Sequence, residues 1–188
     1  MFNNKLNLGC GGNLIKGYLN IGYDDGRPDS ESYLNYDLSK NIPVEDNSVD
    51  IIYNSHFLEH LNYFEALNFL SNCYNVMKKN GIMRILVPDL ELWCLKYLQH
   101  DRNFLDTYRN SYLSKDYPTD GLIFMGMLHN HGHKMGWDYQ SLKYWLSHFG
   151  FSSINQKRYR DSDIDEIDVL EPINDGRELE SLCVECYK

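Results

Sequence analysis

The first half of the chain places short apolar segments between polar, glycine-rich loops. Apolar and polar residues alternate over residues 5–8, 17–22 and 32–37, a pattern that predicts three short strands. Residues 49–54 and 82–88 are apolar enough to form central strands that are covered on both faces. Few residues separate the first two strands, so any helix between them is a single turn or absent.

Two helices with clear boundaries follow from the spacing of apolar residues. Asn62 with Glu65 three residues later has the form of a capping box, and the predicted helix stops before Gly81. A second helix is predicted over residues 138–150, with an aspartate at its start and a glycine at its end. Both helices carry one apolar face and therefore pack on a sheet.

The order of these elements indicates an α/β fold. Two further strands are predicted over residues 152–159 and 180–187, and strands that alternate with helices form a parallel sheet. No linker divides residues 1–188, so we expect one domain. The irregular helical pattern of residues 89–135 is predicted to be a lid or substrate-binding insertion.

Polar and glycine-rich residues gather where the predicted strands end. They are the loop at residues 9–11, Asp24, Asp37 and residues 54–56. Ligands of parallel sheets bind at the carboxyl ends of the strands, and glycines let backbone N–H groups approach a ligand closely. The pattern predicts a nucleoside cofactor. A nicotinamide fingerprint would need glycine at position 14, where the chain has leucine.

The composition limits the partners that we expect. The formal net charge is −9, which argues against nucleic acid and against an anionic membrane surface. The sequence has no apolar run near 18 residues and no leader pattern, and its five cysteines are scattered. We therefore expect a cytoplasmic protein with reduced thiols and a small-molecule substrate. Fifteen tyrosines suggest an aromatic pocket or an interface, which leaves a homodimer open.

An ordered set of motifs resembles one enzyme family. The chain carries LNLGCG at residues 6–11, NI at 20–21, DL at 37–38, DIIYNSH at 50–56, EH at 59–60 and GIMRILVPD at 81–89. This order resembles the class I S-adenosylmethionine-dependent methyltransferases, most of all their compact bacterial members. The resemblance implies a Rossmann-like sheet, mostly parallel with an antiparallel terminal strand, and helices on both faces. It also implies an enzyme that uses S-adenosyl-L-methionine.

The resemblance places the cofactor against specific residues. The implied cofactor-binding positions are Leu8, Gly9, Cys10, Gly11, Asp24, Asp37, Leu38, Asn54, Ser55 and His56. Asp37 followed by Leu38 matches the position that meets the adenine amino group. The family's ribose-binding acid is missing, because Gly22 occupies its place; Asp24 or Asp25 could replace it, and of the two we expect Asp24. The alternative is a non-catalytic cofactor-binding or interaction module with the same fold.

Two residues are candidates for catalysis. Of the alternating His129, His131 and His133, we expect His133 to face the substrate, where it can accept a proton from a hydroxyl or amine. In an extended segment the three histidines could instead share a face and bind a metal. Asp89 follows a predicted strand and either caps the next helix or reaches the substrate pocket.

A rival motif points to a different enzyme class. Residues 56–60 spell HxxEH, which on a helix would place both histidines on one face, able to bind zinc. That pattern favours a metal-dependent hydrolase. However, the motif begins where a strand ends, and a hydrolase would leave the glycine loop unexplained. We therefore predict no metal, and a methyltransferase that acts on a hydroxyl or amine of a small molecule such as a sugar or another metabolite.

Overall fold

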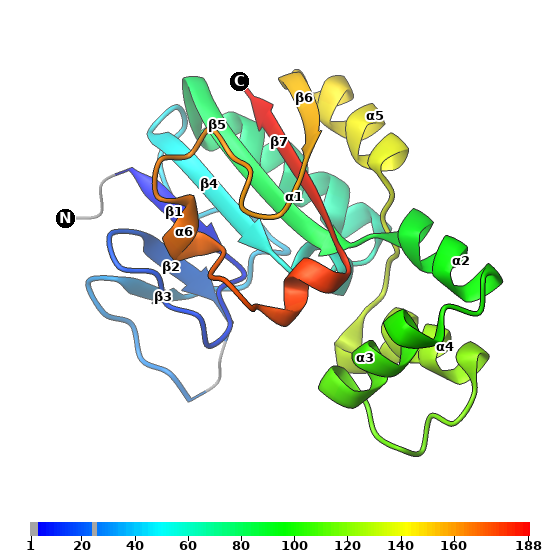
Figure 1. Ribbon diagram of the computed structural model, residues 1–188. Coiled ribbons are helices and arrows are strands. Elements are labelled where there is room, and N and C mark those ends of the chain that lie inside the picture. The colour runs from blue at the N-terminus through cyan, green and yellow to red at the C-terminus, as the bar shows by residue number, and fades with distance from the viewer. Residues whose placement is uncertain (1–3, 24–25) are drawn as a thin grey trace.

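A computed structural model describes residues 4–23 and 26–188, and it contains a seven-stranded sheet with the order β3-β2-β1-β4-β5-β7-β6 (Figure 1). The strands are β1 (Lys5–Leu8), β2 (Leu19–Gly22), β3 (Tyr33–Asn35), β4 (Val49–Ser55), β5 (Met77–Pro88), β6 (Ser152–Lys157) and β7 (Ser181–Tyr187). Strands β1 to β5 pair in parallel, and β7 pairs antiparallel with both β5 and β6. The predicted fold class, including the antiparallel terminal strand, is confirmed.

One face of the sheet is covered by α1 (Tyr63–Val76) and α5 (Tyr139–Phe149) (Figure 1). Both helices begin where the sequence predicts. The side chain of Asn62 accepts a hydrogen bond from Glu65 N at 3.0 Å, and Glu65 Oε2 accepts one from Asn62 N at 2.8 Å, which completes the capping box. The caps orient the apolar faces of α1 and α5, which bury one continuous core against the strands.

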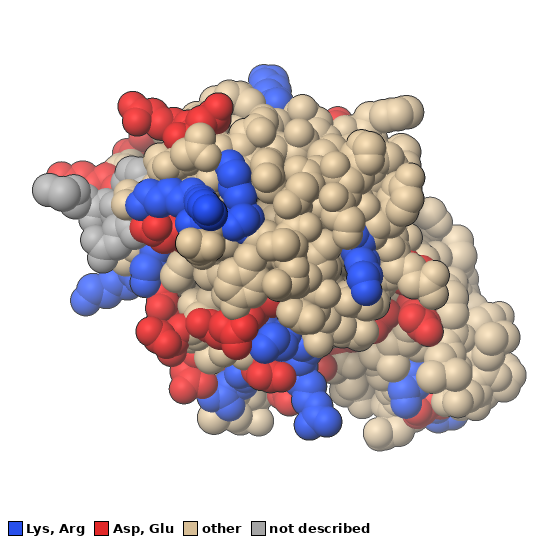
Figure 2. Space-filling model, turned by 90° about the horizontal axis from the view of Figure 1, so that it is seen from above, with Lys and Arg blue, Asp and Glu red and all other residues tan. Residues whose placement is uncertain are grey.

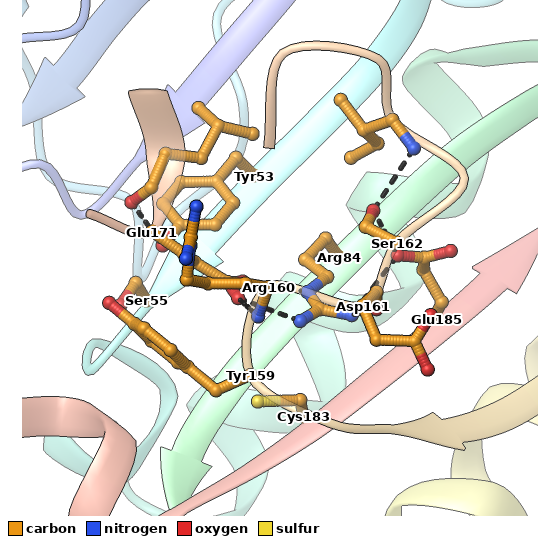
Figure 3. Close-up of polar contacts among 12 residues, drawn as sticks. Tyr53, Ser55, Arg84, Tyr159, Arg160, Asp161, Ser162, Glu171, Cys183 and Glu185 are labelled. Carbon is orange, nitrogen blue, oxygen red and sulfur yellow. Dashed lines mark hydrogen bonds and ion pairs between the residues drawn. The ribbon is translucent and has the colours of Figure 1, made fainter. Parts of the chain in front are cut away.

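The other face of the sheet is covered by residues 158–180, which contain only the short helix α6 (Ile167–Leu170) and the 3-10 turn Gly176–Leu179. Figure 3 shows what ties this segment down: the Arg84 side chain rises from β5 into the segment. Its guanidinium donates to both carboxylate oxygens of Glu171 at 2.8 Å and to Glu185 at 3.1 Å. It also donates to the carbonyl oxygens of Arg158 and Asp161. Arg84 is fully buried, so each of these bonds lies in a medium of low polarity.

A helical extension lies beside the carboxyl end of β5 and consists of α2 (Leu90–Leu98), α3 (Arg102–Tyr112) and α4 (Asp120–His129) (Figure 1). It has its own apolar core around Trp93, which contacts Phe104 and Tyr108 edge-on. This extension falls within residues 89–135, where the sequence predicts a lid or substrate insertion. That role, and the description of the chain as one domain, stay predictions.

The surface mixes both signs of charge. In Figure 2, lysine and arginine side chains lie beside acidic ones on the face shown, and a wide area between them carries no charged residue. Among the described residues, no helix has the length and apolar character needed to cross a membrane. Cys183 and Cys186 lie in the cores on opposite faces of the sheet, because they are three residues apart on one strand.

Candidate functional site

The glycine loop after β1 depends on a residue without a side chain. Gly9 has φ +73°, and its N–H donates to Ile21 O at 2.8 Å, which folds the loop across the end of β2. A Cβ atom on Gly9 would lie 2.2 Å from Cγ of Phe57. Within the described part of the chain, the N–H groups of Gly11 and Gly12 have no hydrogen-bond partner. The loop therefore offers free backbone donors at the carboxyl edge of the sheet.

A buried amide network holds the loop from behind. Asn7 Nδ2 donates to Asn13 O at 2.9 Å and to Asn20 Oδ1 at 2.8 Å. Asn20 in turn accepts from Ile15 N at 2.7 Å and donates to Ser32 O at 2.9 Å. Asn7 has to donate here, a task that an ionised carboxylate could not perform. Sequence reasoning did not find this network, because amides at strand positions give no local signal of their partners.

The predicted cofactor residues on β1 and β4 lie side by side. The Asn54 side chain donates from Nδ2 to Leu8 O at 2.8 Å, and its Oδ1 is buried with no partner among the described residues. Leu8 and Leu38 are buried in the core. Ser55 Oγ accepts a hydrogen bond from Arg177 Nη1 at 2.8 Å. The orphaned oxygen of Asn54 is an acceptor available to a ligand.

Asp37 lies in the loop after β3. Its Oδ1 accepts hydrogen bonds from Ser39 N at 3.0 Å and Ser39 Oγ at 2.7 Å. These bonds lower the pKa of the Asp37 carboxyl, with a smaller contribution from Lys40. The carboxylate therefore caps its own loop and also stays ionised and partly exposed at the edge where the glycine loop lies.

The position of the missing ribose acid lies close to a neighbouring side chain. A Cβ atom on Gly22 would lie 3.0 Å from Sγ of Cys10. Asp24, the expected replacement, lies outside the described residues. Arg27, which the sequence did not single out, donates to Gly11 O at 2.8 Å and lies over the Tyr33 ring at 4.9 Å. The loop that carries Arg27 has no periodic pattern from which this contact could be predicted.

A cavity of about 260 Å³ lies beyond the end of β4. Its lining comes from four separate parts of the chain: His56, His60, Tyr108, Tyr112, His131, His133, Arg177 and Glu180. The predicted lid, residues 89–135, contributes the two tyrosines together with His131 and His133, and the segment after α6 contributes Arg177 and Glu180. The lining is aromatic and polar, so it suits a small polar molecule with groups that hydrogen-bond.

The two predicted catalytic residues have different surroundings. His133 lines the cavity, and its Nδ1 lies 2.6 Å from Met127 O. Burial lowers the pKa of His133, against an opposing effect of Glu59. Asp89 is not among the lining residues; its Oδ1 accepts hydrogen bonds from Glu91 N and Leu92 N at the start of α2. Of the two roles considered for Asp89, these contacts are those of a helix cap.

The HxxEH motif does not lie on one helix. His56 has φ +51°, residues 58–60 form a 3-10 turn, and α1 begins only at Tyr63. His56 Nε2 lies 2.7 Å from Ser181 Oγ, and its Nδ1 lies 3.3 Å from Glu59 Oε1. The helical geometry that would present both histidines of the motif on one face is thus absent from residues 56–60.

Glu180 is a site residue that the sequence did not indicate. Its Oε2 accepts a hydrogen bond from Trp93 Nε1 at 2.9 Å, and the residue is 4% exposed. Burial raises the pKa of Glu180 to about 7, although His56 and the bond from Trp93 oppose the shift. Its partner is 87 residues away along the chain, so no local pattern could reveal the pair.

Comparisons with known proteins support the fold. The family described as "Methyltransferase domain" matches residues 23–85, and no curated protein matches the chain. A SAM-dependent methyltransferase from Archaeoglobus fulgidus is 17% identical with a TM-score of 0.54, over 98% of this chain and 85% of that one. A chain in the complex of the Haloferax volcanii Trm112 methyltransferase activator with its candidate methyltransferase is 14% identical with a TM-score of 0.56, over 97% and 80%.

A human structure has the same fold with its cofactor bound. N-acetylserotonin methyltransferase in complex with SAM is 12% identical with a TM-score of 0.53, over 98% of this chain and 47% of that one. At such identities these likenesses concern the fold. The chain therefore has the fold of S-adenosylmethionine-dependent methyltransferases, and its residues 23–85 match the methyltransferase-domain family.

Proposed function

We propose that this chain binds S-adenosyl-L-methionine along the carboxyl ends of β1, β2 and β4 and methylates a small molecule held in the cavity. The observation that carries the proposal is the contact between the two regions. Asn54 borders the glycine loop, and His56, two residues further on, lines the cavity. A strand advances about 3.3 Å per residue, so these two residues start about 7 Å apart, and a cofactor at the loop would lie next to a substrate in the cavity.

The residues around the glycine loop fit this cofactor. Gly9 keeps the space beside Phe57 free, and the N–H groups after it are open donors. The buried Oδ1 of Asn54 and the ionised Asp37 are acceptors for the cofactor's amino groups. Asp24 is the proposed acceptor for the ribose hydroxyls. The bound cofactor would supply a methyl group that its sulfonium already activates.

His133 is the better placed of the two catalytic candidates. Because the carbonyl of Met127 can only accept, Nδ1 of His133 carries the proton, and the lone pair stays on Nε2. Burial lowers the pKa of His133, so the ring is neutral at pH 7 and able to accept a proton from a hydroxyl or amine. Asp89 already accepts two backbone hydrogen bonds, so it is the weaker candidate for catalysis.

Calorimetric titration with S-adenosylmethionine and S-adenosylhomocysteine tests the proposal. We expect one site per chain, and Asp37→Ala weakens binding at least about tenfold, since it removes a charged acceptor. Ser39→Ala is the matched control, because it removes one bond within the loop and leaves the carboxylate in place. No binding of either ligand, or equal losses in both variants, contradicts the proposal.

A second candidate function is a cofactor-binding module without turnover, and Gly22 is the observation that favours it. Gly22 carries no side chain that could accept hydrogen bonds from a ribose, and a Cβ atom there would lie 3.0 Å from Sγ of Cys10. Transfer of a labelled methyl group to any hydroxyl or amine acceptor excludes this candidate. Tight cofactor binding without transfer to a broad acceptor panel supports it.

A further inference from the structure

We propose that Glu59, His60 and His133 form a binding site for a divalent cation of the zinc type in the wall of the cavity. The three side chains can each offer one ligand atom, and these atoms all lie within 4.8 Å of one another. His60 and His133 line the cavity directly, and Glu59 is buried behind them. The site differs from the HxxEH arrangement, because its second histidine comes from the segment before α5.

The strongest evidence is the isolation of the Glu59 carboxylate. Glu59 is 1% exposed, and neither oxygen accepts a hydrogen bond from any described residue. The ring nitrogens that approach Oε1 are His56 Nδ1 at 3.3 Å and His133 Nε2 at 4.0 Å, and the second of these carries no proton. A buried carboxylate without partners is costly, and a bound cation would supply the missing partner.

The His133 ring has the orientation of a metal ligand. Its Nδ1–H donates to Met127 O at 2.6 Å, so the Nε2 lone pair is directed toward Glu59. Histidines that bind metals commonly donate their other ring N–H to a carbonyl or carboxylate, which fixes the tautomer and the ring orientation. The contact between His133 and Met127 is a partner of that kind.

Main-chain bonds hold the two parts of the site together. The N–H groups of Lys134 and Met135 both donate to Glu59 O, at 2.7 and 3.1 Å. They clamp the segment that carries His133 onto the 3-10 turn that carries Glu59 and His60. The rings of His60 and His133 meet edge-on with their centroids 4.8 Å apart. The cluster is therefore fixed by the backbone and does not depend on a metal for its assembly.

The ligand set selects the cation. Two imidazoles and one carboxylate suit zinc and its transition-metal neighbours, whereas magnesium and calcium prefer oxygen ligands. Tetrahedral bonds of about 2.1 Å place ligand atoms about 3.4 Å apart, so the cluster has to contract by roughly 1 Å on loading. Three protein ligands leave a fourth position open, and the cavity lies on that side.

The site's use in catalysis, unlike metal binding itself, rests on the proposed function. A cation at this place would polarise an acceptor hydroxyl directly, as a Lewis acid. The Nε2 lone pair of His133 then binds the metal and no longer accepts the proton, because one lone pair cannot do both. Metal loading therefore decides between the two roles of His133.

The test is a zinc titration of the purified, chelator-treated full chain in competition with a chromophoric zinc indicator. We expect one zinc per chain, no comparable binding of magnesium, and at least tenfold weaker zinc binding in Glu59→Gln, His60→Ala and His133→Ala. His148→Ala is the matched control, because His148 is an exposed histidine outside the cluster and should not change the affinity. Far-UV circular dichroism establishes that each variant is folded, and Glu59→Gln keeps the shape of its side chain.

Each outcome separates this inference from the proposed function. Absence of zinc binding, or equal affinity in Glu59→Gln and wild type, overturns the metal site whether or not S-adenosylmethionine binds. Zinc binding that depends on Glu59 supports the site even in a protein that binds no S-adenosylmethionine, which would contradict the proposed function alone. Loss of zinc binding in His148→Ala would assign the metal to the surface and overturn the inference.

Discussion

The glycine loop is shaped by main-chain groups, whereas the cavity beside it is lined by side chains from four separate segments. At the loop, Gly9 and Gly11 present backbone, and the bonds of Gly9, Asn7 and Asn20 run between residues fewer than 20 positions apart. At the cavity, Glu180 bonds to Trp93 and Arg177 bonds to Ser55, across 87 and 122 positions. We therefore expect substitutions that add side-chain atoms to disturb the loop, and substitutions that remove charged groups to disturb the cavity.

The largest effect is expected where the cavity's supporting segment is anchored. Arg84→Ala leaves the carboxylates of Glu171 and Glu185 buried without their cation, and losing one partner of a buried pair costs about 5 kcal/mol. Urea denaturation should show this loss of folding free energy. The hydrogen bonds of Arg84 hold residues 158–180 in place. Arg84→Ala should therefore disturb the cavity, which Arg177 and Glu180 line, before it disturbs the glycine loop.

An ion pair between the last residue of β6 and this segment, accessible to solvent, is the control for Arg84. Lys157 lies 3.2 Å from Asp163, and both are solvent-accessible. Lys157→Ala should cost less than about 1 kcal/mol, because water screens surface pairs. Equal losses for Lys157→Ala and Arg84→Ala would show that the buried network does not anchor the segment.

Gly9→Ala should have the second-largest effect. A Cβ atom would overlap Phe57, and φ +73° strains any L side chain, which together cost about 4 kcal/mol. Gly12→Ala is the matched variant, because a Cβ atom there meets no atom within 4 Å. Thermal unfolding should separate the two variants clearly. A Gly9→Ala protein as stable as Gly12→Ala would refute the geometry of the loop.

Glu180 should make the cavity side sensitive to pH. Its pKa rises from 4.5 to about 7 on folding, so the folded chain binds this proton more tightly than the unfolded chain. Stability should therefore fall as the pH rises from about 4.5 to 7, by up to about 3 kcal/mol, and then level off.

Glu180→Gln tests that slope, because the amide keeps an acceptor for Trp93 and removes the charge. Urea denaturation at pH 5 and pH 8, with chelator present, should show a smaller difference between the two pH values than in wild type. Glu178→Gln, an exposed change in the same segment, should keep the wild-type difference. An unchanged slope in Glu180→Gln would mean that another group titrates.

The same contrast explains what the sequence could predict. The capping box at Asn62, the strand alternation and the glycine loop are local patterns, and the structure confirms the elements that they predicted. The rival HxxEH hypothesis required a helix over residues 56–60, and the positive φ of His56 turns the chain before α1 begins. Arg84 lay hidden inside an apolar strand, since its partners are 87 and 101 residues away.

The central claim is that S-adenosylmethionine binds at the glycine loop, and hydrogen–deuterium exchange with S-adenosylhomocysteine tests its location directly. Saturating ligand should slow exchange of the amides in residues 9–13 and 36–39, where free donors and Asp37 lie. Exchange in α5, on the far side of the molecule from the loop, should stay unchanged. Protection that is absent from residues 9–13, or confined to other segments, would contradict the account.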